Sequence, residues 1–168
     1  WLHLADISRR LKKPHTTVRK YMSLLEKQGI LEKNIKGRLT LYRLNISSPL
    51  VVDYMTMAEK EKLIRMCKSN LLLNELTSIL HQNLGEDNKA LVFGSIAENT
   101  AKVHDIDLLI TGNFAFPDKI KEFEKNFGIT VHLMNVKSLG AVNQALKTEI
   151  IKKHLIIHGS EEILKWLI

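Results

Sequence analysis

The chain has 168 residues, a hydrophobic content of 45% and a formal net charge of +7. Its length allows one domain or two small ones, and either arrangement buries a core. The single cysteine, Cys67, excludes an internal disulfide and a zinc cluster built on cysteines. No apolar run approaches the roughly 20 residues that span a bilayer, and no signal peptide pattern opens the chain. We therefore expect a cytoplasmic protein without a membrane partner.

Positive charge is concentrated at the N-terminal end. Residues 1–45 contain eleven Lys and Arg against three Asp and Glu, whereas residues 46–168 contain fourteen against fifteen. This asymmetry predicts two domains, the first of which has a polyanionic partner.

The basic segment predicts two helices followed by a hairpin. Pro14 is well placed for the first turn of the second helix, Val18, Met22 and Leu25 form one apolar stripe along it, and Gly29 ends it. The hairpin has a basic tip, Ile35-Lys36-Gly37-Arg38. In chain order, the predicted elements are a short strand at Leu2–Leu4, helices over Ala5–Leu11 and His15–Gln28, and strands at Ile30–Asn34 and Leu39–Leu44.

Residues 2–45 resemble the winged helix-turn-helix domains of prokaryotic transcription regulators. The resemblance implies double-stranded DNA as a partner, with the second helix in the major groove and the hairpin along the backbone. The alternative is that the domain docks a protein. The residues expected at base edges are His15, Thr16, Thr17 and Lys20, and those expected at phosphates are Arg19, Lys36 and Arg38.

This family normally has a further helix before the strand at Leu2–Leu4. We expect either that this helix was removed or lost upstream, or that another element, such as one from a second subunit, covers the exposed face. A homodimer would also place two recognition helices on DNA half-sites about 34 Å apart.

The turn-rich segment Asn45–Pro49 is the expected domain boundary. Two helices, at Thr56–Cys67 and Asn70–Leu84, are predicted to follow it, and the second is broadly apolar. The expected domains are a DNA-binding domain over 1–45, a helical connector over 46–85 and an α/β domain over 86–168.

Strands with interleaved helices are predicted for the rest of the chain, which makes the whole protein a mixed α+β fold. The expected elements are strands at Ala90–Phe93 and Ile106–Ile110, a helix at Pro117–Phe127, a strand at Ile129–Val136, a helix at Ser138–Lys153, a strand at Leu155–His158 and a helix at Glu161–Ile168.

The most specific motif is Phe93-Gly94-Ser95, followed after nine residues by Asp105-Ile106-Asp107-Leu108. Backbone N–H groups at a Gly-Ser turn, together with the hydroxyl, can hold a phosphate. Asp105 and Asp107 are two residues apart, so on a strand both carboxylates leave the same face. Such carboxylates are hard oxygen ligands for Mg²⁺.

This combination resembles the DNA polymerase β-like nucleotidyltransferases, particularly their minimal branch. The resemblance implies Mg²⁺ as cofactor and a nucleoside triphosphate as substrate or ligand. It assigns metal binding and catalysis to Asp105 and Asp107, and nucleotide binding to Gly94 and Ser95. Relatives of this type include toxin-modifying antitoxins, so the resemblance also implies a toxin-type protein partner.

The chain departs from the pattern at the third catalytic carboxylate, where His132 stands instead. An imidazole can act as a base near pH 7 or ligate a transition metal, but it is a poor carboxylate substitute on Mg²⁺. Basic residues frequent after Gly-Ser are replaced by Ile96 and Glu98, which weakens the expected triphosphate site unless Lys102 compensates.

Two functions follow from these features. The sequence favours a DNA-binding transcription regulator whose second domain binds Mg²⁺-nucleotide with weak or no catalysis. The alternative is an active enzyme that moves a nucleoside monophosphate to a hydroxyl of a protein or a small molecule. The two functions differ in whether His132 can take the role of the third catalytic carboxylate.

Overall fold

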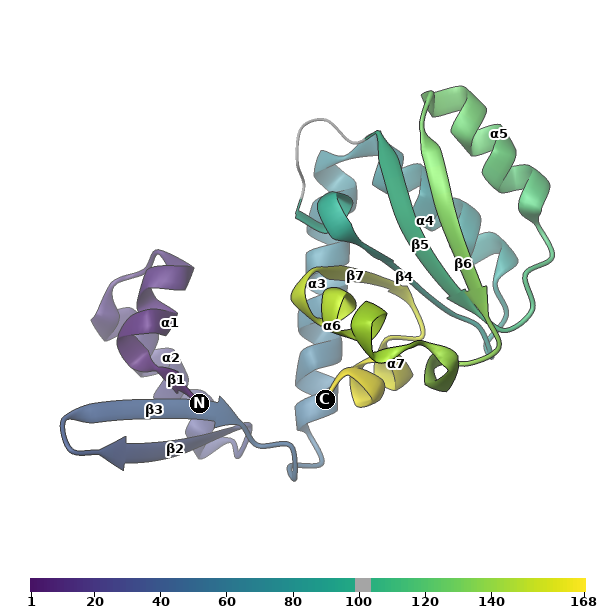
Figure 1. The fold of residues 1–168 in the computed structure, drawn as a ribbon. Coiled ribbons are helices and arrows are strands. Elements are labelled where there is room, and N and C mark those ends of the chain that lie inside the picture. Colours follow the sequence, from purple (N-terminus) through teal and green to yellow (C-terminus); the bar gives the residue numbers. More distant parts are fainter. Residues whose placement is uncertain (99–103) are drawn as a thin grey trace. The chain divides into compact units, whose positions relative to one another are not determined.

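The computed structural model describes residues 1–98 and 104–168. The described residues form seven α-helices, two short 3₁₀ turns and two β-sheets, which confirms a mixed α+β fold. The chain divides into two compact units, Trp1–Tyr54 and Met55–Ile168. Figure 1 shows the N-terminal unit in purple and blue and most of the second unit in teal to yellow.

The N-terminal unit combines two helices with a three-stranded antiparallel sheet in the order β1-β3-β2. Leu4, Val18 and Tyr42 form its buried centre, one from each of α1, α2 and β3. Val18 belongs to the apolar stripe expected from the sequence. The elements are β1 (Leu2–His3), α1 (Leu4–Leu11), α2 (His15–Lys27), β2 (Leu31–Lys36) and β3 (Leu39–Leu44).

The tip of the hairpin is shorter than the sequence predicted. Ile35 and Lys36 belong to strand β2, where they pair with Thr40 and Leu39. Only two residues, Gly37 and Arg38, form the turn. Gly37 has φ +60°, a conformation that glycine adopts without steric cost and that two-residue hairpin turns require.

The second unit is built around a four-stranded sheet in the order β6-β5-β4-β7. Strands β5 and β6 are parallel, whereas β4 is antiparallel to both of its neighbours. Helix α3 (Val51–Ser69) begins in the N-terminal unit and continues into the second from Met55 onward. The other helices of the second unit are α4 (Leu71–Asn83), α5 (Pro117–Phe127), α6 (Gln144–Lys152) and α7 (Ser160–Leu167), and its strands are β4 (Lys89–Phe93), β5 (Asp105–Thr111), β6 (Thr130–Val136) and β7 (His154–His158).

Alternation along β5 separates the main core from the opposite face of the sheet. Ile106, Leu108 and Ile110 are completely buried and pack in one cluster with residues of α4 and α5. Asp105 and Asp107 alternate with these positions, Asp105 just before Ile106 and Asp107 just after it, and so leave the other face. The core therefore fixes the strand while the two carboxylates stay outside that core.

Two predicted helices have different bounds in the structure. Helix α3 begins at Val51 and ends at Ser69, longer than the expected Thr56–Cys67. The expected helix over Ser138–Lys153 is wrong in its first part, because Leu139–Ala141 is a 3₁₀ turn and α6 begins only at Gln144. The Asn143 side chain caps this later start by accepting a hydrogen bond from the Leu146 N–H at 2.9 Å.

Candidate functional site

The Gly94-Ser95 turn begins directly after strand β4. Gly94 has φ +73°, and a Cβ atom at this position would lie 2.8 Å from Oδ2 of Asp107. A larger residue would therefore be strained in its backbone and would also collide with the carboxylate. Ser95 is exposed in the 3₁₀ turn that follows, Gly94–Glu98. The structure thus brings Gly94, Ser95 and Asp107 to one place.

Strand pairing explains this meeting of two segments distant in sequence. Phe93 is the register partner of Asp107 on the antiparallel pair β4–β5, so the turn after Phe93 starts beside that carboxylate. Asp105 and Asp107 share one face of β5, separated by the completely buried Ile106. Asp105 is exposed, whereas the Asp107 side chain is only 33% exposed.

His132 stands on the other neighbour of β5. It is the register partner of Asp107 in the parallel pair β5–β6, and its Nδ1 lies 3.3 Å from Oδ1 of Asp107. The side chain is 54% exposed. At the start of the same strand, the Glu124 carboxylate of α5 accepts a hydrogen bond from the Val131 N–H at 2.7 Å. This bond ties the segment that carries His132 to the helix before it.

The donor chemistry of this face fits Mg²⁺ when a nucleotide is present. Mg²⁺ is commonly held by one or two carboxylates together with substrate phosphates and water, and Asp105 and Asp107 supply those carboxylates. Within residues 1–98 and 104–168, no three His, Cys, Asp or Glu side chains form a group that could hold a metal ion. At a site of this kind, phosphate and water would supply further ligands.

The sequence points to Ile96 and Lys102 as residues that bear on triphosphate binding after Gly94-Ser95, and the structure describes only the first of them. Ile96 is completely buried and belongs to the main core. Its apolar side chain therefore anchors the Gly94–Glu98 turn to that core. Lys102, the expected nucleotide-binding lysine, lies outside the described residues.

The residues expected to bind DNA lie on the N-terminal unit and are all exposed. The first turns of α2 carry five of them, around the buried Val18, and the hairpin carries the other two. In chain order they are His15, Thr16, Thr17, Arg19, Lys20, Lys36 and Arg38.

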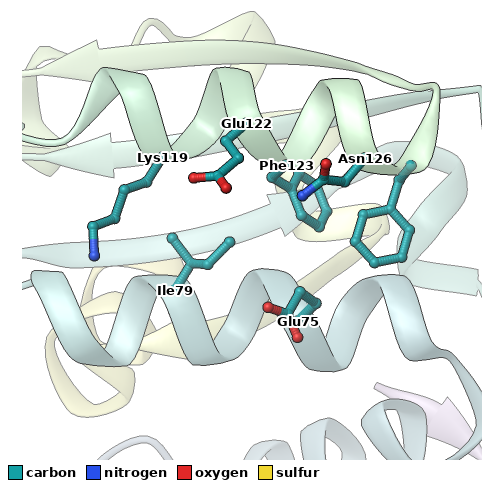
Figure 2. A pocket seen from close by; sticks show the side chains of 7 residues that line it. Glu75, Ile79, Lys119, Glu122, Phe123 and Asn126 are labelled. Carbon is teal, nitrogen blue, oxygen red and sulfur yellow. The ribbon is translucent and has the colours of Figure 1, made fainter.

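A groove that the sequence did not predict lies between α4 and α5, with a volume of about 420 Å³. Figure 2 shows Glu75 and Ile79 on one helix facing Lys119, Glu122 and Asn126 on the other. These helices pack on the core face of the sheet, away from Asp105 and Asp107. Periodicity within one helix does not specify the offset between two helices, so the sequence carried no signal for this groove.

Comparison with known families identifies the second unit. Residues 73–158, just over half of the chain, match the nucleotidyltransferase domain family. The chain belongs to this family. The match favours the enzymatic alternative over the DNA-binding regulator that the sequence favours, because it is a match to a family of nucleotidyltransferases.

Two solved structures are similar to 56% of the chain, and in each case the similarity spans 79% of the matched chain. One is a toxin–antitoxin with AMP-PNP, at a TM-score of 0.43 and 14% sequence identity. The other is a mutant of the toxin–antitoxin MntA-HpeT, at a TM-score of 0.42 and 11% identity. No curated protein matches the chain. Within the described residues, no helix is long and apolar enough to cross a membrane.

Proposed function

We propose that the chain is a nucleotidyltransferase that moves a nucleoside monophosphate from a nucleoside triphosphate to a hydroxyl group. One observation carries the proposal. In a chain of the nucleotidyltransferase family, the Gly94-Ser95 turn lies against Asp107, which shares an outward face of β5 with Asp105. This is the arrangement that transfer requires, because phosphate-binding groups must stand next to metal-binding carboxylates.

In the proposed reaction the oxygen of the acceptor hydroxyl attacks the α-phosphorus of the triphosphate. The bond from the α-phosphorus to the oxygen bridging to the β-phosphate breaks, and pyrophosphate leaves with its electron pair. The acceptor proton passes to a basic group of the site or to water. A bound divalent cation would supply charge neutralisation on the phosphates. Ser95 and the backbone of the turn would orient the triphosphate, and Asp105 and Asp107 would hold the cation.

The acceptor in this proposal is a hydroxyl on a protein or a small molecule. Asp105 and His132 are both exposed at the edge of the site, which leaves room for a hydroxyl carried by a large partner. A toxin-type protein is one acceptor of this kind.

Incubation with each of the four ribonucleoside triphosphates, labelled at the α-phosphate, tests the proposal. The reaction would contain Mg²⁺ or Mn²⁺ and cell extract as a source of acceptors. We expect label transfer by the wild type and none by Asp105→Asn/Asp107→Asn. Absence of transfer with every nucleotide and both metals would contradict the proposal. Transfer only after His132→Asp would show that the site has lost catalytic activity because it lacks the third carboxylate.

As a second function, we propose that the N-terminal unit is a winged helix-turn-helix that binds double-stranded DNA. The supporting observation is the exposure of Arg19, Lys20, Lys36 and Arg38 on α2 and the β2–β3 hairpin, since such side chains neutralise phosphates. The recognition residues would be His15, Thr16 and Thr17 at the start of α2.

Fluorescence anisotropy of the full chain with duplex DNA, measured over a range of salt concentrations, tests this second proposal. We expect affinity to fall steeply as salt increases. Binding that is absent, or that is independent of salt, would contradict it. Light scattering on the same samples would test the homodimer, whose two recognition helices would occupy adjacent half-sites.

A further inference from the structure

Helix α3 carries large apolar side chains on the face that points away from the core. Met57 and Ile64 are 68% and 56% exposed, and they stand on one side of the helix because seven residues make about two turns. Met66, two residues from Ile64 and so nearly on the opposite side of α3, is buried in the main core. Exposed apolar residues at this spacing are typical of a helix that packs along another helix.

A hollow lies beside Ile64, between α3 and α4. It has a volume of about 730 Å³, and its lining includes Ile64 and Cys67 of α3 and Leu71 and His81 of α4. Leu71 is 71% exposed. A second hollow of about 540 Å³ shares Leu63, Ile64 and His81 with the first and extends to the end of β7. A row of apolar side chains next to a groove is the surface relief that packs one helix against another.

The charges on the same face are complementary to themselves. A two-fold axis between Lys60 and Glu61 would set a second α3 antiparallel to the first and place Met57 opposite Ile64 of the second copy. Lys60 would then face Glu61 of the second copy, and both residues are exposed. A parallel pair would instead oppose lysine to lysine and glutamate to glutamate, which repel.

A symmetric dimer needs a surface that is complementary to itself, and this face of α3 meets that condition. We propose that it binds the same face of a second copy of the chain, with the two α3 helices antiparallel. This α3 surface consists of Met57, Lys60, Glu61, Ile64 and Leu71. Neither nucleotide nor DNA enters the argument, so the inference is independent of the proposed functions.

A different protein is the competing occupant of the α3 surface, and exchange of charges distinguishes the two. In a dimer of copies, Lys60→Glu would face Glu61 of the second copy, and Glu61→Lys would face Lys60. The double variant Lys60→Glu/Glu61→Lys restores opposite charges on both sides of the two-fold axis. A foreign partner keeps its own charges, so the double variant would not restore its binding.

Sedimentation equilibrium of the full chain over a range of concentrations is the measurement. The variants are Ile64→Glu, the two single charge changes and the double exchange. Ile151→Glu is the matched control, because Ile151 is an apolar residue of α6 that is 48% exposed. Thermal melts followed by circular dichroism establish that each variant is folded.

We expect a wild-type dimer that dissociates on dilution. Ile64→Glu should weaken the association by at least about tenfold, as expected for a residue at the centre of an interface, and Ile151→Glu should leave it unchanged. Each single charge change should weaken it by about fivefold, since two ion pairs are lost and like charges are opposed. The double exchange should return it to within about twofold of the wild type.

Cross-linking tests the orientation of the two helices. Cys67 is the only cysteine of the chain, so Cys67→Ser provides a background for Met57→Cys and Ile64→Cys. When these two proteins are mixed and oxidised, the antiparallel dimer predicts disulfides between Met57→Cys and Ile64→Cys chains, whereas a parallel dimer predicts disulfides between identical chains.

Four results would overturn the inference: a monomer at every concentration, a dimer insensitive to Ile64→Glu, a double exchange that does not restore association, or disulfides between identical chains only. A monomer whose Cys67 is shielded from a thiol reagent by cell extract alone would assign the surface to a different protein, and would overturn it as well.

Discussion

Gly94 and Asp107 are in contact across the β4–β5 pair, so close that a Cβ atom on Gly94 would lie 2.8 Å from Oδ2 of the carboxylate. The position also has φ +73°. The positive φ angle favours glycine because other residues are strained in this backbone conformation. The contact also requires glycine, because a side chain at this position would collide with the carboxylate of Asp107. Glycine at position 94 is therefore needed both for the backbone of the turn and for the position of the Asp107 carboxylate.

Replacement of Gly94 by alanine should abolish nucleotide binding while the protein stays folded. Alanine in the left-handed region costs roughly 1–2 kcal/mol, and the methyl group would also displace the Asp107 carboxylate. Gly128→Ala is the matched control, because Gly128 has φ +63° but open space around a Cβ atom. Chemical denaturation should show similar destabilisation in both variants, and calorimetric titration with a non-hydrolysable nucleotide should show a binding loss only in Gly94→Ala. Equal nucleotide affinity in the two variants would contradict the role given to this contact.

Asn88 is predicted to be a structural centre of the second unit. It is buried, its Oδ1 accepts from the Gly85 N–H, and its Nδ2 donates to the carbonyl oxygens of Thr111 and Asn113 at 2.8 and 2.9 Å. Asn88→Asp replaces the donor with a carboxylate facing two carbonyls. Because an unsatisfied buried polar group costs about 1–3 kcal/mol, the free energy of unfolding should fall by at least that amount.

The control for Asn88 is Asn113→Asp, the same change at an exposed loop position. Urea denaturation at neutral pH should leave this control within about 0.5 kcal/mol of the wild type. A comparable loss in both variants would mean that added charge, rather than the hydrogen bonds of Asn88, causes the destabilisation.

The turn at Gly94 and the strand face of Asp105 and Asp107 could be predicted from the sequence, because each depends on a few neighbouring residues. A short apolar run before Gly-Ser and an Asp-x-Asp alternation specify a turn and a strand face without knowledge of the rest of the chain. The meeting of Gly94, Asp107 and His132 was not legible from spacing, since it depends on the register of three strands. The same holds for the start of α6, which depends on the Asn143 cap rather than on apolar periodicity.

Lys36→Ala with Arg38→Ala should weaken DNA binding for all sequences if the hairpin contacts the backbone. Both residues are exposed, and loss of two phosphate contacts should reduce the slope of log affinity against log salt by roughly 2. Anisotropy titrations at several salt concentrations measure this slope. Lys121→Ala with Lys125→Ala, on exposed positions of α5, is the charge-matched control. A slope unchanged in the hairpin variant would contradict the assignment.

Glu162 is expected to contribute to stability in a pH-dependent way. Its pKa is lowered from 4.5, first by a hydrogen bond from its own backbone N–H and also by Lys89, whose Nζ lies 3.3 Å from its Oε1. A lowered pKa in the folded state gives stability that is present above pH 4.5 and is lost as the pH falls through the lowered pKa.

Because Glu162 is more than half exposed, solvent screens the pair and its contribution should be roughly 0.2–1 kcal/mol. Glu162→Gln should therefore be less stable than the wild type at pH 7, with the difference shrinking below pH 4. Denaturation curves across this range provide the measurement, with Glu86→Gln as an exposed control. A difference that persists unchanged at pH 3 would attribute the effect to packing instead of charge.

The most direct test of the central claim is to compare label transfer from ATP, GTP, CTP and UTP carrying ³²P at either the α or the γ position. Nucleotidyl transfer predicts that wild-type protein moves the α label to an acceptor, leaves the γ label in pyrophosphate, and does neither after Asp105→Asn/Asp107→Asn. Transfer of the γ label would indicate phosphoryl transfer instead. Transfer of the α label that persists in the double variant would contradict the assignment of the site to Asp105 and Asp107.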